Sequence, residues 1–413
     1  MQGAKIQEGI YWQEKSKPGR HFAILFIKIE KDASLSATYQ ELQGLWNLLT
    51  DLKEGKTPEL GDFILPDCRL NITVGYGQNV FQINGVKKEK PEPLVTYGLL
   101  RTALPNGGGD VLRGSGLKYA PETIKNFATE DVCLQFIADT PLGVNRAVVE
   151  TWKYLQNCKN ILFVRFYDGF QREDRRSWLG FHDGISNLKS GAERLDAIEI
   201  KPGIQKDEWT TGGTYLYFLR IKVDLSAWNA LSLTAQELLV GRNKITGCPL
   251  VQISRKKPVS VKGCPAKDTR DISAKNLSGK TVNAAFFDAP MVSNEILLAS
   301  HIQRANHHIS PVSDRNSLRI FRQGYEFLES QGNAPGLSAG LNFISFQDTP
   351  ERVNRMLTQA TWLGKVNFGG KENEQTNGID KLLSVTAGGI YLIPPANTRS
   401  KLPGFEIFEE EVA

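Results

Sequence analysis

The sequence His21-Phe-Ala-Ile-Leu-Phe-Ile-Lys-Ile-Glu30 is apolar and rich in β-branched residues, which predicts a strand. Directly after it, leucine and aromatic residues recur every three or four positions between Leu35 and Leu52. This is the spacing of an amphipathic helix that buries one face. The two patterns together predict a strand that is followed at once by a helix packed against it.

Three more strands and a second helix complete this first unit. Alternation predicts a half-buried strand over residues 70–76, and apolar runs predict strands over residues 133–138 and 161–166. Thr140 suits the N-cap and Pro141 the first position of a helix between the last two strands. The order β-α-β-β-α-β is the split pattern of a ferredoxin-like sheet.

The second half of the chain repeats this order of elements, without a residue-level repeat. Strands are predicted over residues 214–223, 318–327, 341–346 and 388–393, a short helix over residues 234–240, and a capped helix that starts at Pro350. The fold class is therefore α+β, with two duplicated ferredoxin-like halves and antiparallel sheets.

The predicted boundaries follow the composition. Residues 1–190 form the N-terminal half, which ends just after an Asp-Gly motif, and residues 212–413 form the C-terminal half. Residues 191–211 are rich in Lys, Gly, Glu and Asp, which is typical of a connection. Residues 87–129 lack periodicity and are interpreted as a long ordered loop or lid.

Composition and charge restrict the class of protein. The chain has 413 residues, and its 50 Lys and Arg against 45 Asp and Glu give a net charge of +5, too weak to indicate a nucleic-acid partner. No apolar run has the length of a membrane span or a signal peptide. Five widely spaced cysteines without a C-x-x-C pair indicate reduced thiols, and hence a cytoplasmic protein without structural zinc.

Several common catalytic motifs are missing. The sequence contains five histidines and no H-E-x-x-H, G-x-S-x-G, Walker A or dinucleotide-binding pattern. Zinc hydrolase, serine hydrolase, ATPase and nicotinamide-dependent functions are therefore disfavoured.

Two segments carry residues suited to chemistry. The first is Gly180-Phe-His-Asp-Gly184, which by itself is typical of a tight turn. The second is His301-Ile-Gln-Arg304, with Arg322 following 21 residues after His301. Alone, His301 fits a structural histidine as well as a functional one.

Taken together, in order and spacing, these segments resemble the dye-decolourising peroxidase family, haem proteins with two ferredoxin-like halves. The resemblance implies one haem b per chain, held mainly by the C-terminal half, with His301 as axial ligand of the iron. It also implies that Asp183 moves a proton during peroxide cleavage and that Arg322 stabilises the developing charge.

Further site residues follow from the same resemblance. Arg304 matches a position that pairs with a haem propionate, although it also suits a surface arginine. Leu341 and Phe343 match the walls of the distal pocket, and plain core packing suits them equally well. Gly184 belongs to the cofactor-binding motif. Surface electron transfer is a possible role for Trp178, Tyr325 and Trp362, for which aromatic packing is the simpler interpretation.

The chain also departs from the family pattern. Gln303 replaces the usual arginine after His-Ile, and Gly324 stands where some members have a serine. In Phe346-Gln-Asp-Thr-Pro350 the acid that usually supports the axial histidine lies one place early. Asp348 and Thr349 are both good helix caps, which is the favoured role over proximal hydrogen bonding.

Two functions are consistent with these observations. The first is a peroxidase whose partners are hydrogen peroxide and a bulky organic reductant such as a dye or a phenolic compound. The alternative is a haem-binding carrier, sensor or shell cargo with little turnover, which the displaced acid and Gln303 motivate. A homo-oligomer is compatible with either function, and no membrane partner is expected.

Overall fold

The computed structural model describes residues 5–97, 102–103, 110–111, 131–203, 208–262, 289–305, 319–330, 335–353, 382–397 and 401–409. Nine strands of this part form a single sheet in which all pairs are antiparallel. They are β1 (His21–Ile29), β2 (Asn71–Tyr76), β5 (Val132–Ala138), β6 (Ile161–Phe170), β7 (Thr214–Val223), β10 (Phe321–Arg322), β11 (Tyr325–Ser330), β12 (Leu337–Gln347) and β13 (Leu383–Ile393).

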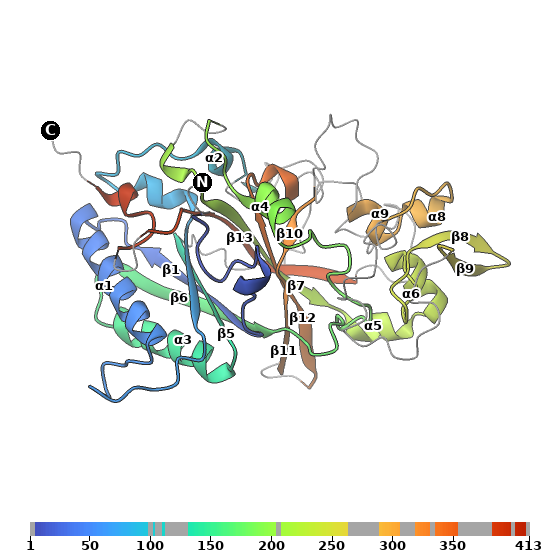
Figure 1. Ribbon diagram of the computed structural model, residues 1–413, viewed down its shortest axis with the longest axis horizontal. Coiled ribbons are helices and arrows are strands. Elements are labelled where there is room, and N and C mark those ends of the chain that lie inside the picture. Colours follow the sequence, from blue (N-terminus) through green and yellow to red (C-terminus); the bar gives the residue numbers. More distant parts are fainter. Residues whose placement is uncertain are drawn as a thin grey trace.

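The sheet closes on itself. Strands of the N-terminal half follow the order β6-β1-β5-β2, and those of the C-terminal half follow β11-β12-β7-β13. The two groups meet at both edges, where Leu392 pairs with Tyr76 and Glu326 pairs with Phe170. The result is a barrel-like arrangement at the centre of the molecule (Figure 1).

Alternation along the strands assigns side chains to the two faces of this closed sheet. Phe22 and Phe26 of β1 lie in the core between the two halves, where Phe26 contacts Phe218 of β7 with ring centroids 5.6 Å apart. Leu25 of the same strand points the other way, into the core beneath the helices. Burial on both faces explains why the sequence of β1 is almost continuously apolar.

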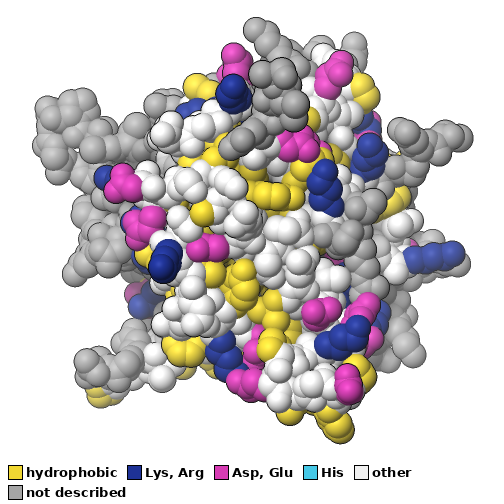
Figure 2. Space-filling model, turned by 90° about the vertical axis from the view of Figure 1, so that its left-hand side faces the viewer, with side chains coloured by type: hydrophobic (Ala, Val, Ile, Leu, Met, Phe, Trp, Pro, Cys, Tyr) yellow, Lys and Arg dark blue, Asp and Glu magenta, His cyan; other side chains and the backbone are white. Residues whose placement is uncertain are grey.

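Two helices cover the outer face of the N-terminal half: α1 (Leu35–Lys53) and α3 (Pro141–Leu155), at the left of Figure 1. The predicted cap of α3 is confirmed, because Thr140 Oγ1 accepts a hydrogen bond from the Gly143 N–H and Pro141 opens the helix. Figure 2 shows this side of the molecule, where cationic and acidic side chains are intermixed among apolar patches. This face therefore carries no extended patch of a single charge sign among its described residues.

The C-terminal half carries a different set of helices on its outer side. They are α5 (Leu225–Ala230), α6 (Leu233–Val240), α8 (Glu295–Leu298) and α9 (His301–Ala305), with the hairpin of β8 (Leu250–Ser254) and β9 (Lys257–Ser260) beyond them (Figure 1). α9 packs against α6 and α8. This packing places the first residue of α9, His301, beside the sheet.

Three predicted segments differ from the structure. The strand predicted over residues 318–327 is divided into β10 and β11 at Gln323 and Gly324, although both pair with β12 in one register. The predicted connection over residues 191–211 contains a helix, α4 (Ala192–Ile198), because the buried Arg194 stacks on Phe321 and anchors it. The predicted loop over residues 87–129 begins with a helix, α2 (Glu92–Tyr97), and lies mostly outside the described residues.

The prediction of reduced thiols is wrong at one position. Cys68, Cys133 and Cys158 are free, but Cys248 is disulfide-bonded. Spacing along the chain does not reveal which cysteines the fold brings within bonding distance. Thiol content therefore no longer supports the cytoplasm as the compartment of this protein. In the described part of the chain, no helix has the length and apolar character to cross a membrane.

Glu41 of α1 ties this helix to the start of β6. Its carboxylate accepts hydrogen bonds from the backbone N–H groups of Lys159, Asn160 and Ile161, at 3.0 to 3.1 Å, and from the Asn160 side chain at 2.8 Å. We expect Glu41→Ala to lower the free energy of unfolding by about 2 kcal/mol, because it leaves these donors without their charged acceptor.

Urea unfolding of the two proteins measures this difference. A matched control is Glu59→Ala, which removes an exposed carboxylate paired with Lys153 and is expected to cost less than about 1 kcal/mol. Equal effects of the two substitutions would contradict the role given to Glu41.

Candidate functional site

The candidate site is a cavity on the outer face of the C-terminal half of the sheet. Residues of β7 and β12 whose side chains point away from the barrel core line it, namely Ile221, Val223, Leu341 and Phe343. On the same strands, the intervening residues, such as Ile344, fill the barrel core instead. The period of two along a strand therefore gives the cavity an apolar floor.

His301 approaches this cavity from the start of α9. Desolvation and the positive charges of Arg322 and Arg242 lower the pKa of His301 to about 3. Its imidazole is thus neutral at neutral pH, and a neutral imidazole is the form that binds a metal.

Asp183 and Arg322 form an ion pair in the wall of the cavity. Arg322 Nη1 lies 3.3 Å from Asp183 Oδ1, and both side chains are partly exposed, by 30% and 42%. The Gly184 N–H donates to Asp183 Oδ1 at 2.7 Å, as an Asp-Gly turn does. One carboxylate thus makes both the turn hydrogen bond and the ion pair with Arg322.

Asn187 holds Arg322 in place. Its side chain donates to the Arg322 carbonyl at 2.6 Å and accepts from the Arg322 N–H at 3.1 Å. The segment that carries Asp183 is therefore fastened to the strand that carries Arg322. Sequence analysis missed this function of Asn187, although the residue lies only four positions after Asp183.

The Asp183 segment is itself a folded-back loop. Arg176 and His182 form an antiparallel bridge, and Gly180 turns the chain with φ of 83°. Burial and the charge of Arg176 lower the pKa of His182 to about 4. The neutral ring accepts a hydrogen bond at Nε2 from Arg176 Nη2, 2.8 Å away. His182 therefore stabilises the loop as a neutral acceptor.

A buried carboxylic acid, Glu326 of β11, lies near the ion pair. It lines the cavity, and its burial and the negative charge of Asp183 raise its pKa to about 8, against the opposing charge of Arg172. Glu326 is thus mostly protonated at neutral pH. Sequence analysis missed Glu326, because a glutamate in the sequence of β11 gives no sign that it lies near Asp183 in the fold.

Two further arginines reach the cavity. Arg242 donates to the Gly247 carbonyl and the Ser186 hydroxyl, and Arg319 donates to the Ser186 carbonyl at 2.9 Å. Arg242 is 7% exposed. The cavity therefore combines an apolar floor with two guanidinium groups, a set that suits an apolar ligand with carboxylate groups.

The structure brings together most of the residues that the sequence analysis singled out. Asp183, Gly184, His301, Arg322, Leu341 and Phe343 all line the cavity. Arg304 belongs to α9, but its side chain lies outside the described residues, as does Trp362. Trp178 also lines the cavity and donates to the Phe327 carbonyl, whereas Tyr325 is fully buried and stacks on Phe22.

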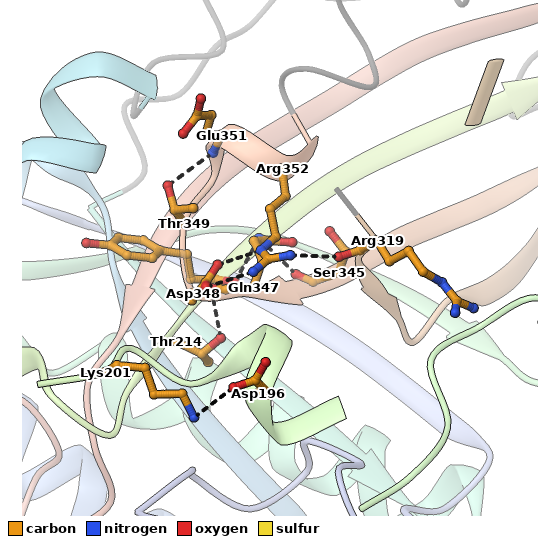
Figure 3. A network of polar contacts seen from close by, with 11 residues as sticks. Asp196, Lys201, Thr214, Arg319, Ser345, Gln347, Asp348, Thr349, Glu351 and Arg352 are labelled. Carbon is orange, nitrogen blue, oxygen red and sulfur yellow. Dashed lines mark hydrogen bonds and ion pairs between the residues drawn. The ribbon is translucent and has the colours of Figure 1, made fainter. Parts of the chain in front are cut away.

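Figure 3 shows the hydrogen bonds of Asp348 and Thr349, the two residues that follow β12. Both carboxylate oxygens of Asp348 accept hydrogen bonds from Arg352, at 2.6 and 2.9 Å. Thr349 Oγ1 accepts from the Glu351 N–H at the start of the following helical turn. Capping by Thr349 is confirmed, and Asp348 anchors this turn through Arg352.

Glu326 makes the stability of the protein depend on pH. Its pKa is about 8 in the folded chain and near the ordinary glutamate value of 4.5 when unfolded, so the folded state holds more protons between these values. We expect the wild type to lose stability relative to the Glu326→Gln variant as pH rises from about 5 to about 8. Urea midpoints across this range measure the effect, and parallel pH profiles would contradict it.

The fold of this chain is similar to the folds of several solved structures. Ferric DtpA from Streptomyces lividans is 18% identical and superposes with a TM-score of 0.68, covering 99% of this chain and 96% of that chain. A DyP-type peroxidase from Cellulomonas bogoriensis is 20% identical with a TM-score of 0.63, covering 95% and 94%. A DypB variant from Rhodococcus jostii in complex with heme is 16% identical with a TM-score of 0.60, covering 96% and 98%. These likenesses concern the fold.

Curated relatives are similar in sequence. A deferrochelatase of Shigella flexneri serotype 5b is 26% identical over 305 residues, which cover 71% of this chain and 61% of that protein. The deferrochelatase of Escherichia coli K12 is 25% identical over 348 residues, covering 77% and 70%. The match with the first of these spans less than two thirds of its length. A family model described as "Dyp-type peroxidase, C-terminal" matches residues 174–398, more than half of the chain, and the chain therefore belongs to the Dyp-type peroxidase family.

Proposed function

We propose that this protein is a haem peroxidase that reduces hydrogen peroxide and oxidises bulky organic compounds such as dyes or phenolics. The observation that carries the proposal is the composition of one cavity, which has a neutral imidazole from α9 and the Asp183–Arg322 ion pair in its wall. Family membership supports the same activity.

The residues of the cavity fit a haem b group. Leu341, Phe343 and Ile221 offer apolar surface for a macrocycle, and the neutral His301 is suited to bind iron as the axial ligand. Arg242 and Arg319 are suited to hold propionates, in addition to the expected partner Arg304. Haem, when bound, supplies the redox centre at which peroxide gains two electrons.

Asp183 and Arg322 have separate tasks in this proposal. Asp183 would accept a proton from one oxygen of peroxide and deliver it to the other, outer oxygen, which leaves as water. Arg322 donates hydrogen bonds to the charge that develops on the outer oxygen, and it does so without losing its own charge. Asn187 holds the backbone of Arg322, and the Gly184 N–H orients the Asp183 carboxylate.

The division of the chain into two similar halves is also part of our proposal. We infer a duplicated ferredoxin-like fold with halves at residues 1–190 and 212–413, joined by residues 191–211. The strand orders β6-β1-β5-β2 and β11-β12-β7-β13 support it, because each places the first and third strands of its half at the centre.

Replacement of Asp183 or Arg322 tests the activity. We expect Asp183→Asn and Arg322→Leu to slow the absorption change of the haem-loaded protein after one equivalent of peroxide by about 10² to 10⁴-fold. Stopped-flow spectra measure the rate. The matched control is Asp62→Asn, an exposed site outside the cavity, which should react as the wild type does.

Other outcomes separate the alternatives. A normal haem spectrum that ignores peroxide in the wild type would favour a carrier or sensor. Release of iron with the macrocycle intact, detected with an iron chelator, would instead agree with the name of the deferrochelatase relatives. We expect His301→Ala to lose the spectrum of the bound haem, which checks the assignment of the axial ligand.

A further inference from the structure

A second cavity, of about 440 Å³, shares a wall with the cavity of the candidate site. Asp183, Arg322, Glu326 and Leu341 line both cavities, so these side chains stand between the two spaces. The lining of the second cavity also includes Glu173, whose side chain is 90% exposed. The second cavity therefore reaches solvent, and Glu326 lies between solvent and the candidate site.

Trp178 fixes the position of Glu326 in this wall. Its backbone N–H forms a hydrogen bond with the Glu326 carboxyl, and its indole N–H donates to the carbonyl of the next residue, Phe327, at 2.9 Å. Glu326 is buried, and its strand β11 pairs with β12 on one side and with β6 on the other. The carboxyl is therefore held both by its own strand and by the loop that leads to Asp183.

The surroundings of Glu326 favour its neutral form. Burial has the largest effect, and the negative charges of Asp183 and Asp174 act in the same direction, against the positive charge of Arg172. Arg172 is itself paired with Asp174, and Arg322 is paired with Asp183. The pKa of Glu326 is raised to about 8 as a result, so this residue holds a proton at neutral pH.

The proposed reaction needs protons that Asp183 does not supply. Reduction of one hydrogen peroxide to two waters takes two electrons and two protons. Both hydrogens of peroxide leave with the first water, because Asp183 only moves one of them from one oxygen to the other. The second water therefore takes both of its protons from elsewhere, while its two electrons come from the organic reductant.

We propose that Glu326 passes protons from solvent to Asp183 for the second water. The O–H bond of the Glu326 carboxyl breaks, the proton moves to the Asp183 carboxylate, and Asp183 gives it to the remaining oxygen. Glu326 then takes a new proton from solvent through the second cavity, and a second cycle completes the water. Glu326 acts through Asp183 and is thus a positioning residue. The inference rests on the proposed peroxidase function and adds the route of its protons.

The two waters can be separated in time. We would mix the haem-loaded protein with one equivalent of peroxide in a stopped-flow cell and then add ferrocyanide, which gives electrons and carries no protons. For Glu326→Gln we expect the first absorption change at the wild-type rate, because glutamine is neutral as the protonated acid is. The return of the spectrum after ferrocyanide should slow about tenfold at neutral pH.

Two readouts distinguish proton transfer from a packing role. The return rate of the wild type should fall as pH rises through about 8, where Glu326 loses its proton, and this fall should be absent in Glu326→Gln. Without peroxide, the infrared difference between wild type and Glu326→Gln at neutral pH should contain the carbonyl band of a protonated carboxylic acid.

Two further variants complete the test. Glu326→Asp keeps a carboxylic acid and should recover part of the return rate that Glu326→Gln loses. The matched control is Glu59→Gln, which replaces an exposed carboxylate that lines neither cavity and should behave as the wild type does.

An unchanged return rate in Glu326→Gln, or the same fall near pH 8 in that variant, would overturn the proposal. So would the absence of the infrared band, or a return rate in Glu326→Asp no higher than in Glu326→Gln. A wild-type haem that ignores peroxide would contradict the peroxidase function itself, and the role of Glu326 with it. These results differ, because the first absorption change occurs normally in the former cases and is missing in the last.

Discussion

Closure of the antiparallel sheet is the constraint on which the candidate site depends. A closed sheet has a filled interior and an outer face that helices must cover. Alternate side chains of each strand therefore pack into the interior or lie on the outer face. On β12, Ile344 and Phe346 fill the barrel, and Leu341 and Phe343 face the cavity. The cavity floor is rigid for this reason, because moving it would disturb the barrel core behind it.

The polar residues of the site come from distant parts of the chain. Burial and neighbouring charges set the pKa values of Glu326 and His301. Asp183 pairs with Arg322, and Glu326 lies near this pair, where burial first and the negative charge of Asp183 second raise the pKa of Glu326. His301 is neutral because both burial and the nearby arginines oppose its protonation. One small region thus holds an ion-paired acid, a mostly neutral acid and a neutral imidazole, groups that suit proton transfer and metal binding.

Part of this was predictable from local signals. The strand of β1, the helix α1 and the cap at Thr140 follow from apolar spacing and from the chemistry of Ser, Thr and Pro at helix starts. Asp183, His301 and Arg322 were recognised by motif and order, and the structure places them around one cavity. In contrast, α4 was missed, because its helix depends on Arg194 packing against Tyr11 and Phe321, which are remote in sequence.

The sequence by itself determined the main strands, the helices α1, α3 and α6, and the identity of the residues in the motif segments, because these depend on periodicity and on neighbours within a few positions. Tertiary structure decided how the sheet closes, that Cys248 is in a disulfide, and that Asn187 clamps Arg322. It also decided that Glu326 lies near Asp183, in the lining of the same cavity. Coulomb forces and hydrogen bonds act through space, and only the folded chain brings these groups within their range.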